Sequence, residues 1–309
     1  MAAQPVLEGH VTAPGERMGE IDRLRASLQE AGYVADRALG AALLLMLELG
    51  RPLLLEGDAG VGKTEVAKAL ATVRGARLIR LQCYEGLDAH AAMYEWNYQR
   101  QLLAIKLLEG DERSVEQKEQ DIFSERFLLR RPLLEAISTA EQAVLLIDEV
   151  DRADEAFEAY LLELLSDFQM SIPELGTVRA VSRPLVVITS NGTRELSDAL
   201  RRRCLYQYID YPDFEKELAI VELKAPQAAG ALARQLVAFV QSVRRMDLQK
   251  KPGIAETLDW AAALLRMGIS SVDDDGAERI LESLAALVKT RADRTAFTRD
   301  VVARIAAAC

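Results

Sequence analysis

The chain has 309 residues, of which half are hydrophobic, and its 48 acidic and 38 basic side chains give a net charge of −10. This length supports one large hydrophobic core with a smaller second domain. The acidic balance argues against a basic stripe that follows nucleic-acid phosphates, and three distant cysteines with two histidines support neither a disulfide framework nor a cysteine or histidine metal centre. The apolar run at residues 41–47 is far shorter than the roughly 20 residues of a membrane span.

Residues 1–15 are rich in Ala, Pro and Gly, and we expect them to be disordered. They lack the apolar core of a signal peptide, so we expect a cytoplasmic protein. Apolar residues at helical spacing then predict helices over residues 16–31 and 35–49, the second of which would cover one side of a sheet.

A short apolar strand at residues 52–56 runs directly into the sequence GDAGVGKT and a following helix, which is the spacing of the Walker A pattern. Its three glycines let several backbone N–H groups point at one concavity, where the helix N-terminus also favours an anion. Lys63 can reach the outer phosphates, and the hydroxyl of Thr64 can occupy a position on Mg²⁺. The sequence therefore predicts a site for ATP and Mg²⁺ formed by Gly57, Asp58, Ala59, Gly60, Val61, Gly62, Lys63 and Thr64.

After a predicted strand at residues 77–81, an insertion near residues 85–121 carries Tyr94, Trp96 and Tyr98 at alternate positions. In an extended segment the three rings would face one way and could grip part of a client protein. Aromatic residues at regular spacing are more often part of a packed core, and both interpretations stay open.

Residues 143–147 have the composition of a fully buried strand, and Asp148-Glu149 follows directly, as in a Walker B pattern. Asp148 would hold Mg²⁺ through its water shell, and Glu149 would polarise a water for attack on the γ-phosphate. Helices are predicted on either side, at residues 132–139 and 154–168.

A second insertion near residues 169–181 reads as a β-hairpin that turns through Glu174-Leu175-Gly176. Another buried strand at residues 185–189 then ends in Ser190-Asn191. Because the carboxyl ends of parallel strands meet at one edge of a sheet, Asn191 can orient the water or touch the γ-phosphate. Asn191-Gly192 is also a strong turn signal, and the two roles are compatible.

Three adjacent arginines, Arg201, Arg202 and Arg203, follow a short helix that begins near Ser197. They cannot share one helix face, so at least one should point outward. In oligomeric ATPases such an arginine reaches the γ-phosphate of a neighbouring subunit. The alternative is a solvated basic patch.

A strand at residues 204–209 completes a doubly wound parallel α/β sheet. Beyond residue 212 strand signals stop, and amphipathic helices are predicted at residues 215–223, 231–243, 254–267, 277–288 and 298–308. We therefore predict a nucleotide-binding domain at residues 16–212 and a helical lid domain at residues 213–309.

The order of strand, glycine loop, Asp-Glu, strand-Asn and arginine cluster resembles the P-loop AAA+ ATPases. The segments 57–64, 81–107, 145–176 and 189–212 resemble the MoxR family, and its CoxD-like branch in particular. This resemblance implies a homo-oligomeric ring, a hexamer, that hydrolyses ATP to remodel a client protein, often with a partner containing a von Willebrand factor A domain. The implied client is a molybdenum-containing hydroxylase of the carbon monoxide dehydrogenase type, whose metal centre is completed after folding.

By the same resemblance either Arg202 or Arg203 is the arginine finger, and Arg152 lies near the subunit boundary. The chain departs from the wider family at residues 250–257, where no arginine stands at the start of the lid helix. Lys251 either substitutes for that sensor residue or is solvated. The rival interpretations are a nucleic-acid-dependent ATPase, acting as a motor or loader, and a nucleotide-gated scaffold with negligible hydrolysis.

Overall fold

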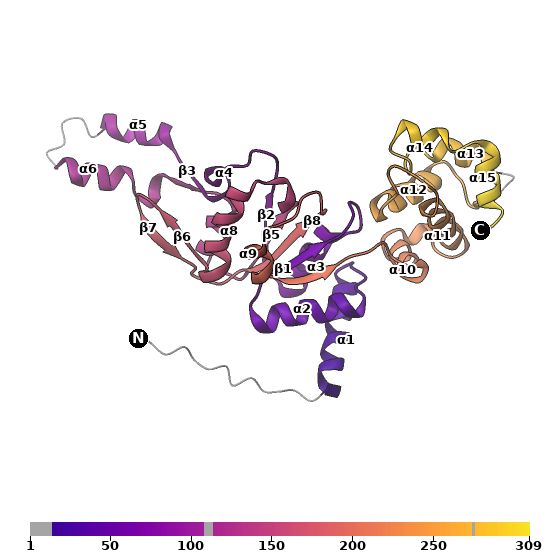
Figure 1. The fold of residues 1–309 in the computed structure, drawn as a ribbon, viewed down its shortest axis with the longest axis horizontal. Coiled ribbons are helices and arrows are strands. Elements are labelled where there is room, and N and C mark those ends of the chain that lie inside the picture. The colour runs from indigo at the N-terminus through magenta and orange to yellow at the C-terminus, as the bar shows by residue number, and fades with distance from the viewer. Residues whose placement is uncertain (1–13, 108–113, 274–275) are drawn as a thin grey trace.

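The structure is a computed structural model that describes residues 14–107, 114–273 and 276–309. At its centre lies a five-stranded parallel sheet with the order β2-β5-β8-β1-β9 (Figure 1). The strands are β1 (Leu53–Glu56), β2 (Arg77–Gln82), β5 (Ala143–Asp148), β8 (Leu185–Ser190) and β9 (Leu205–Tyr208). Five strand predictions are thereby confirmed, and the parallel α/β fold with them.

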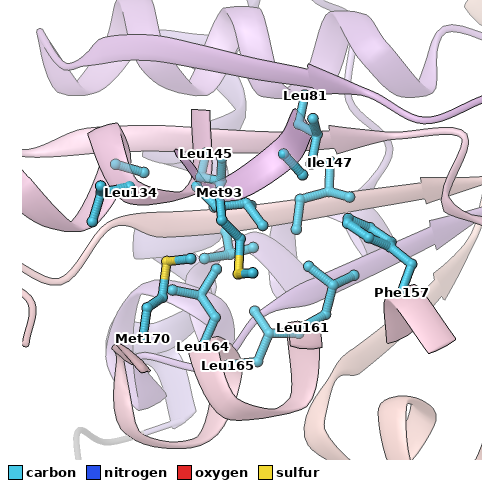
Figure 2. Close-up of a cluster of buried hydrophobic side chains, with 14 of the residues drawn as sticks. Leu81, Met93, Leu134, Leu145, Ile147, Phe157, Leu161, Leu164, Leu165 and Met170 are labelled. Atoms are coloured by element: carbon cyan, nitrogen blue, oxygen red, sulfur yellow. The ribbon is translucent and has the colours of Figure 1, made fainter. Parts of the chain in front are cut away.

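The sheet is buried on both faces, and its central strands are apolar up to their carboxyl ends, where Asp148 closes β5 and Thr189-Ser190 closes β8. In β5, Leu145 and Ile147 face one layer of helices, while Val144 and Leu146 face the other. Figure 2 shows the first layer, where side chains of α8 (Glu155–Asp167) pack against β5 together with Leu134 of α7 (Pro132–Ser138). The opposite layer consists of α1 (Pro14–Glu30), α2 (Arg37–Leu49) and α3 (Lys63–Arg74).

The helices predicted at residues 16–31, 35–49, 132–139 and 154–168 are confirmed to within two residues at each end. Pro14 and Gly15, which were assigned to a disordered terminus, are instead the first residues of α1. The rest of that predicted disordered segment, residues 1–13, lies outside the described residues.

Two insertions extend from the α/β layers. The first contains α4 (Ala89–Met93), β3 (Tyr94–Trp96), α5 (Tyr98–Leu107), α6 (Val115–Ile122) and β4 (Leu128–Arg130), with β3 and β4 antiparallel. The second is the predicted hairpin, β6 (Gln169–Ile172) and β7 (Gly176–Arg179). In Figure 1, α5 and α6 form the end of the molecule most distant from the C-terminal helices.

The idea of three aligned aromatic rings is wrong. Tyr94 and Trp96 are buried in the core and contact each other edge to face, whereas Tyr98 starts helix α5 and is 64% exposed. The backbone leaves the extended conformation after Trp96, so the alternation does not reach the third ring. The core-packing alternative therefore holds for the first two rings.

Helix α9 (Asp198–Arg203) precedes the last strand of the sheet. From Phe214 onward the described residues form helices and no strand: α10 (Phe214–Lys224), α11 (Ala231–Arg244), α12 (Ile254–Arg266), α13 (Ala277–Ser283), α14 (Arg291–Thr295) and α15 (Arg299–Ala306). The helices from α10 onward share a hydrophobic core of their own around Trp260 and Phe239. Within residues 14–107, 114–273 and 276–309, no helix is long and apolar enough to cross a bilayer.

Candidate nucleotide site

The P-loop lies between the end of β1 and the start of α3, at the carboxyl edge of the sheet. Its first residue must be glycine, because a Cβ at Gly57 would come within 2.1 Å of the carbonyl oxygen of Ile209. No side chain caps the N-terminus of α3 at Gly62. The N–H groups of that first turn therefore remain available to an anion.

Lys63 is almost fully buried within this loop. Its ammonium donates to the carbonyl oxygens of Gly57 at 2.6 Å and Asp58 at 2.7 Å, and to Oδ1 of Asn191 at 2.9 Å. Burial lowers the pKa of the lysine, while the carboxylates of Asp151 and other nearby residues act in the opposite direction. The predicted Walker A lysine and the predicted strand-end asparagine thus meet directly.

Asp148 lies beside them at the end of β5 and is only 3% exposed. Its Oδ1 accepts from the hydroxyls of Thr64 at 3.1 Å and Thr189 at 2.6 Å. The hydroxyl and the carboxylate are hard oxygen ligands, and Mg²⁺ at phosphate sites is held by one or two such groups together with the phosphates. The residues therefore fit the metal, although no cluster of three or more His, Cys, Asp or Glu side chains occurs among the described residues.

Glu149 has a left-handed backbone conformation, with φ of 55°, which is uncommon for a residue other than glycine. Its N–H donates to Oγ1 of Thr189 at 2.8 Å, and its carboxylate pairs with Arg152 at 3.3 Å. Backbone strain of this kind is found at functional sites, where surrounding contacts maintain it. Glu149 lines the cavity that the P-loop also borders.

These residues line a cavity of about 410 Å³, a size typical of small-molecule sites. Ala59, Gly60, Val61, Gly62, Lys63, Thr64, Asp148, Glu149 and Asn191 all contribute to its wall. The cavity continues past Tyr33 and Val34 to the lid residues Ile220, Ile254 and Leu258. Gly57 and Asp58 contribute through the carbonyl groups that hold Lys63.

Arg202 and Arg203 lie elsewhere, next to a second cavity of about 460 Å³ that also includes Arg51, Ser166 and Arg183. The following strand starts at Leu205, which pairs with Leu53 at the beginning of β1, so α9 ends at the amino edge of the sheet. The P-loop is at the opposite edge. The structure therefore does not bring the arginines together with the other predicted site residues of the same chain.

Four contributing residues were not predicted: Arg80, Asp151, Thr189 and Thr193. Arg80 on β2 donates from Nε to Oδ2 of Asp148 at 3.1 Å, and Asp151 accepts from the backbone N–H and hydroxyl of Thr193. Polar residues at the ends of apolar strands were a usable signal for Thr189 and Asp151. Arg80 was not detectable, because its approach to Asp148 depends on the register of β2 against β5.

Lys251, for which substitution of the sensor residue and a solvated role were both left open, is exposed and does not line the cavity. From the start of α12, Ile254, Ala255 and Leu258 face the nucleotide cavity instead. Within the described residues, no arginine from α10 to α15 lines this cavity, whereas Lys216 and Lys224 of α10 do.

Comparison with known proteins agrees with this geometry. Residues 52–204 match the sequence profile of the AAA domain (dynein-related subfamily). The gas vesicle ATPase GvpN1 of Halobacterium salinarum is 27% identical over 217 residues, covering 65% of this chain and 59% of that protein. GvpN of Haloferax mediterranei is 26% identical over 243 residues, covering 74% and 65%.

An uncharacterized protein of Staphylococcus haemolyticus, SH1500, is 25% identical over 211 residues, covering 66% of this chain and 72% of that protein. Among solved structures, a mutant of RuvB from Thermotoga maritima matches with a TM-score of 0.48 and 18% identity, over 85% of this chain and 72% of that one. The chain contains an AAA domain, is homologous to gas vesicle ATPases, and is an ATPase that uses ATP with Mg²⁺.

Proposed function

We propose that this ATPase is a MoxR-type AAA+ protein of the CoxD-like branch that remodels a client protein in a ring. The client we propose is a molybdenum-containing hydroxylase of the carbon monoxide dehydrogenase type, with this chain acting as a chaperone in completing its metal centre. The sequence segments 81–107, 145–176 and 189–212 support the branch and therefore the client. The convergence of Lys63, Asp148, Glu149 and Asn191 on one cavity is the observation that carries the ATP-driven part.

In this proposal the residues at the carboxyl edge of the sheet have separate roles in binding the phosphates, holding Mg²⁺ and activating water. The P-loop amides and Lys63 bind the phosphates, and Mg²⁺ held by Thr64 and Asp148 neutralises charge on the outer phosphates. Glu149 orients a water and accepts its proton. Asn191 leaves Lys63 when the phosphates arrive and turns its amide toward the γ-phosphate or the water.

The trans arginine of the ring is the second part of the proposal. Arg201 pairs with Glu56 at 3.0 Å, and Arg203 donates to Ser166 and to the carbonyl of Ala199. The Arg202 side chain has no hydrogen bond or ion pair among the described residues. This difference favours Arg202 as the finger that enters a neighbour's site.

The first insertion is the part that we propose touches the client. Helix α5 exposes several large apolar side chains, namely Tyr98, Leu102, Leu103, Ile105 and Leu107. Exposed apolar groups on one helix are typical of protein-contacting surfaces. Contact with the client, which the sequence suggested for the aromatic residues of this insertion, is therefore assigned to helix α5.

The test is capture of the client on an ATP-locked variant. Glu149→Gln should bind ATP and turn it over slowly, so the protein should accumulate in the state that holds a client. The variant would be incubated with ATP in nuclease-treated native lysate, and captured proteins identified by mass spectrometry. Recovery of a molybdenum hydroxylase subunit or a von Willebrand factor A-domain protein is the expected result.

Lys63→Ala is the matched control, because it removes the phosphate-binding ammonium and should abolish ATP binding while leaving the Glu149 carboxylate in place. Proteins recovered equally on both variants are not ATP-dependent clients. Specific recovery of replication or repair proteins would replace the proposal with a nucleic-acid motor. Specific recovery of gas vesicle proteins would indicate instead that the chain acts on gas vesicle proteins, as the names of its relatives GvpN1 and GvpN suggest for them.

A further inference from the structure

The lid touches the P-loop directly at the start of α12. The backbone N–H of Ile254 donates to the carbonyl oxygen of Gly60 at 2.8 Å. The contact is so close that a Cβ at Gly253 would come within 2.8 Å of that oxygen and 2.9 Å of the Gly60 Cα. Two glycines therefore allow two backbones to meet where side chains would separate them.

Three hydrogen bonds hold residues 252–254, the lid segment that makes this contact. Glu256 accepts from the N–H of Gly253 at 2.9 Å, and the hydroxyl of Thr257 donates to the Gly253 carbonyl at 3.0 Å. Nε of Arg244 donates to the carbonyl of Pro252 at 2.7 Å. Residues 252–254 are thereby held in one conformation.

Behind the loop lies an ion pair that is buried within the lid. Glu217 is fully buried and receives both terminal nitrogens of Arg244, at 2.5 and 2.6 Å, as well as the Thr257 hydroxyl at 2.8 Å. Separating the two partners would leave a buried charge unpaired, which is strongly destabilising. The two side chains are therefore expected to keep this geometry. The pair thus connects α10, α11 and α12 to the loop that meets Gly60.

The same network reaches the connection between the sheet and the lid. Gln241 donates both to Glu217 and to the carbonyl of Pro212, and the Arg244 guanidinium lies 5.2 Å from the centre of the Tyr211 ring. Burial, with a further contribution from Asp58 of the P-loop, raises the pKa of Tyr211 to about 12. Tyr211 and Gly253 are therefore two places at which residues beside this network lie close to the P-loop.

We infer that this chain couples its lid to nucleotide binding through the Gly253–Gly60 backbone contact, with Arg244, Glu217 and Thr257 as positioning residues. No lid arginine lines the nucleotide cavity among the described residues, and Ala255 faces it with a single methyl group. Two cations of α10, Lys216 and Lys224, do line the cavity. The Gly253–Gly60 contact additionally makes the lid respond to the shape of the P-loop. This inference rests on ATP binding in the cavity and is independent of the client.

Gly253→Ala tests the contact without straining its own backbone, because φ of −85° is accessible to alanine. The added methyl group meets backbone atoms of Gly60 that cannot move aside, so the lid must withdraw. We expect ATP binding, followed with the fluorescent analogue mant-ATP, to weaken about tenfold, and kcat to fall as well. Gly19→Ala is the control, since a Cβ there meets nothing within 4 Å.

Thr257→Val provides a second variant that keeps the shape of the buried side chain and leaves the Arg244–Glu217 pair in place. It removes the hydroxyl whose oxygen lies 2.8 Å from Glu217 and 3.0 Å from the Gly253 carbonyl and whose single hydrogen is shared between these two acceptors. We expect mant-ATP binding to weaken by a smaller factor, about threefold, in the same direction. An unchanged melting temperature for both variants would separate a positioning role from a general loss of stability.

Hydrogen exchange gives a direct readout of the contact. The N–H of Ile254 is at the first turn of α12, where no intrahelical acceptor exists, so protection of this amide reports the Gly60 carbonyl. We expect slow exchange of Ile254 in the wild type, slower still with ATP, and fast exchange in Gly253→Ala. Free exchange of Ile254 in the wild type in both conditions, or wild-type mant-ATP affinity in Gly253→Ala, would overturn the inference.

Discussion

The carboxylate with the most hydrogen bonds around the Asn191 loop is Asp151, a residue that motif analysis did not assign to the site. It is 4% exposed and accepts from the backbone N–H groups of Asn191 at 3.2 Å and Thr193 at 3.0 Å, and from the Thr193 hydroxyl at 2.6 Å. Burial raises the pKa of Asp151, but the hydrogen bonds outweigh burial and leave the pKa below its usual value of 3.8. Asp151 therefore fixes the loop that places Asn191 against Lys63.

Asp151→Asn should reduce the free energy of unfolding by about 1–3 kcal/mol at pH 7, because an amide offers one acceptor oxygen where the carboxylate uses two. The lowered pKa stabilises the fold above pH 3.8, and this contribution is lost as the pH falls through the folded-state pKa. The difference between variant and wild type should therefore be constant from about pH 5 to about pH 8 and shrink at about pH 4 and below. Urea unfolding at each pH measures it.

Asp167→Asn is the control for the Asp151 experiment, since Asp167 is exposed at the end of α8. It should leave the urea midpoint unchanged. Equal midpoints for Asp151→Asn and Asp167→Asn at pH 7 would mean that the hydrogen bonds to Asp151 contribute nothing to stability. A lower kcat in Asp151→Asn alone would add evidence that the loop orients Asn191.

At the scale of elements, the buried strands were predicted almost residue for residue. β5 and β8 each begin with a run of apolar residues that is covered on both faces, and such runs are read easily from sequence. Their polar ends, Asp148, Glu149 and Asn191, are adjacent in sequence to the strands that position them. The sequence could for that reason predict that these side chains lie together at one edge of the sheet.

The predictions that were wrong or missing, among helices and among contacts between distant segments, have a common physical cause. The predicted helix at residues 277–288 stops at Ser283, yet Leu284 and Leu287 are still buried, because apolar spacing reports burial and not helical hydrogen bonds. Helix α14, which is short, was missed altogether. Contacts such as Arg80 with Asp148 or Ile254 with Gly60 depend on register and packing between distant segments, which single-sequence patterns do not contain.

The first insertion offers a sharp comparison between its aromatic residues. Trp96→Ala should cost about 3–5 kcal/mol of folding free energy, because the ring is buried and contacts Tyr94 and Phe123 edge to face. Tyr98→Ala should change stability by less than about 0.5 kcal/mol, since its ring is largely exposed. Chemical unfolding of both variants measures the contrast.

Trp96→Phe refines this test. The indole N–H of Trp96 is buried without a hydrogen-bond partner among the described residues, and phenylalanine removes that unsatisfied donor. The loss of folding free energy in Trp96→Phe should therefore be much smaller than in Trp96→Ala. A Tyr98→Ala variant as unstable as Trp96→Ala would contradict the placement of Tyr98 at the exposed start of α5.

At the scale of the whole molecule, one ATP site needs contributions from two chains in the proposed ring. The nucleotide cavity is at the carboxyl edge of the sheet, whereas α9 ends at the amino edge. A protomer therefore presents its catalytic carboxylate and its free arginine at different places. Only a neighbour can bring Arg202 to the Glu149 of a given site.

A mixing experiment tests this arrangement. Glu149→Gln and Arg202→Ala should each be nearly inactive alone, since a trans arginine contributes about 10³ to 10⁵ in rate. In an equal mixture, one interface in about four joins an intact Glu149 to an intact Arg202, so the ATPase rate should recover to about a quarter of wild type.

The Arg203→Ala variant is the matched control, and it should retain most activity alone because Arg203 is bonded to Ser166 and Ala199 within its own chain. Arg203→Ala losing activity while Arg202→Ala keeps it would exchange the roles of the two arginines, and an inactive mixture would mean that the arginine does not act across the ring.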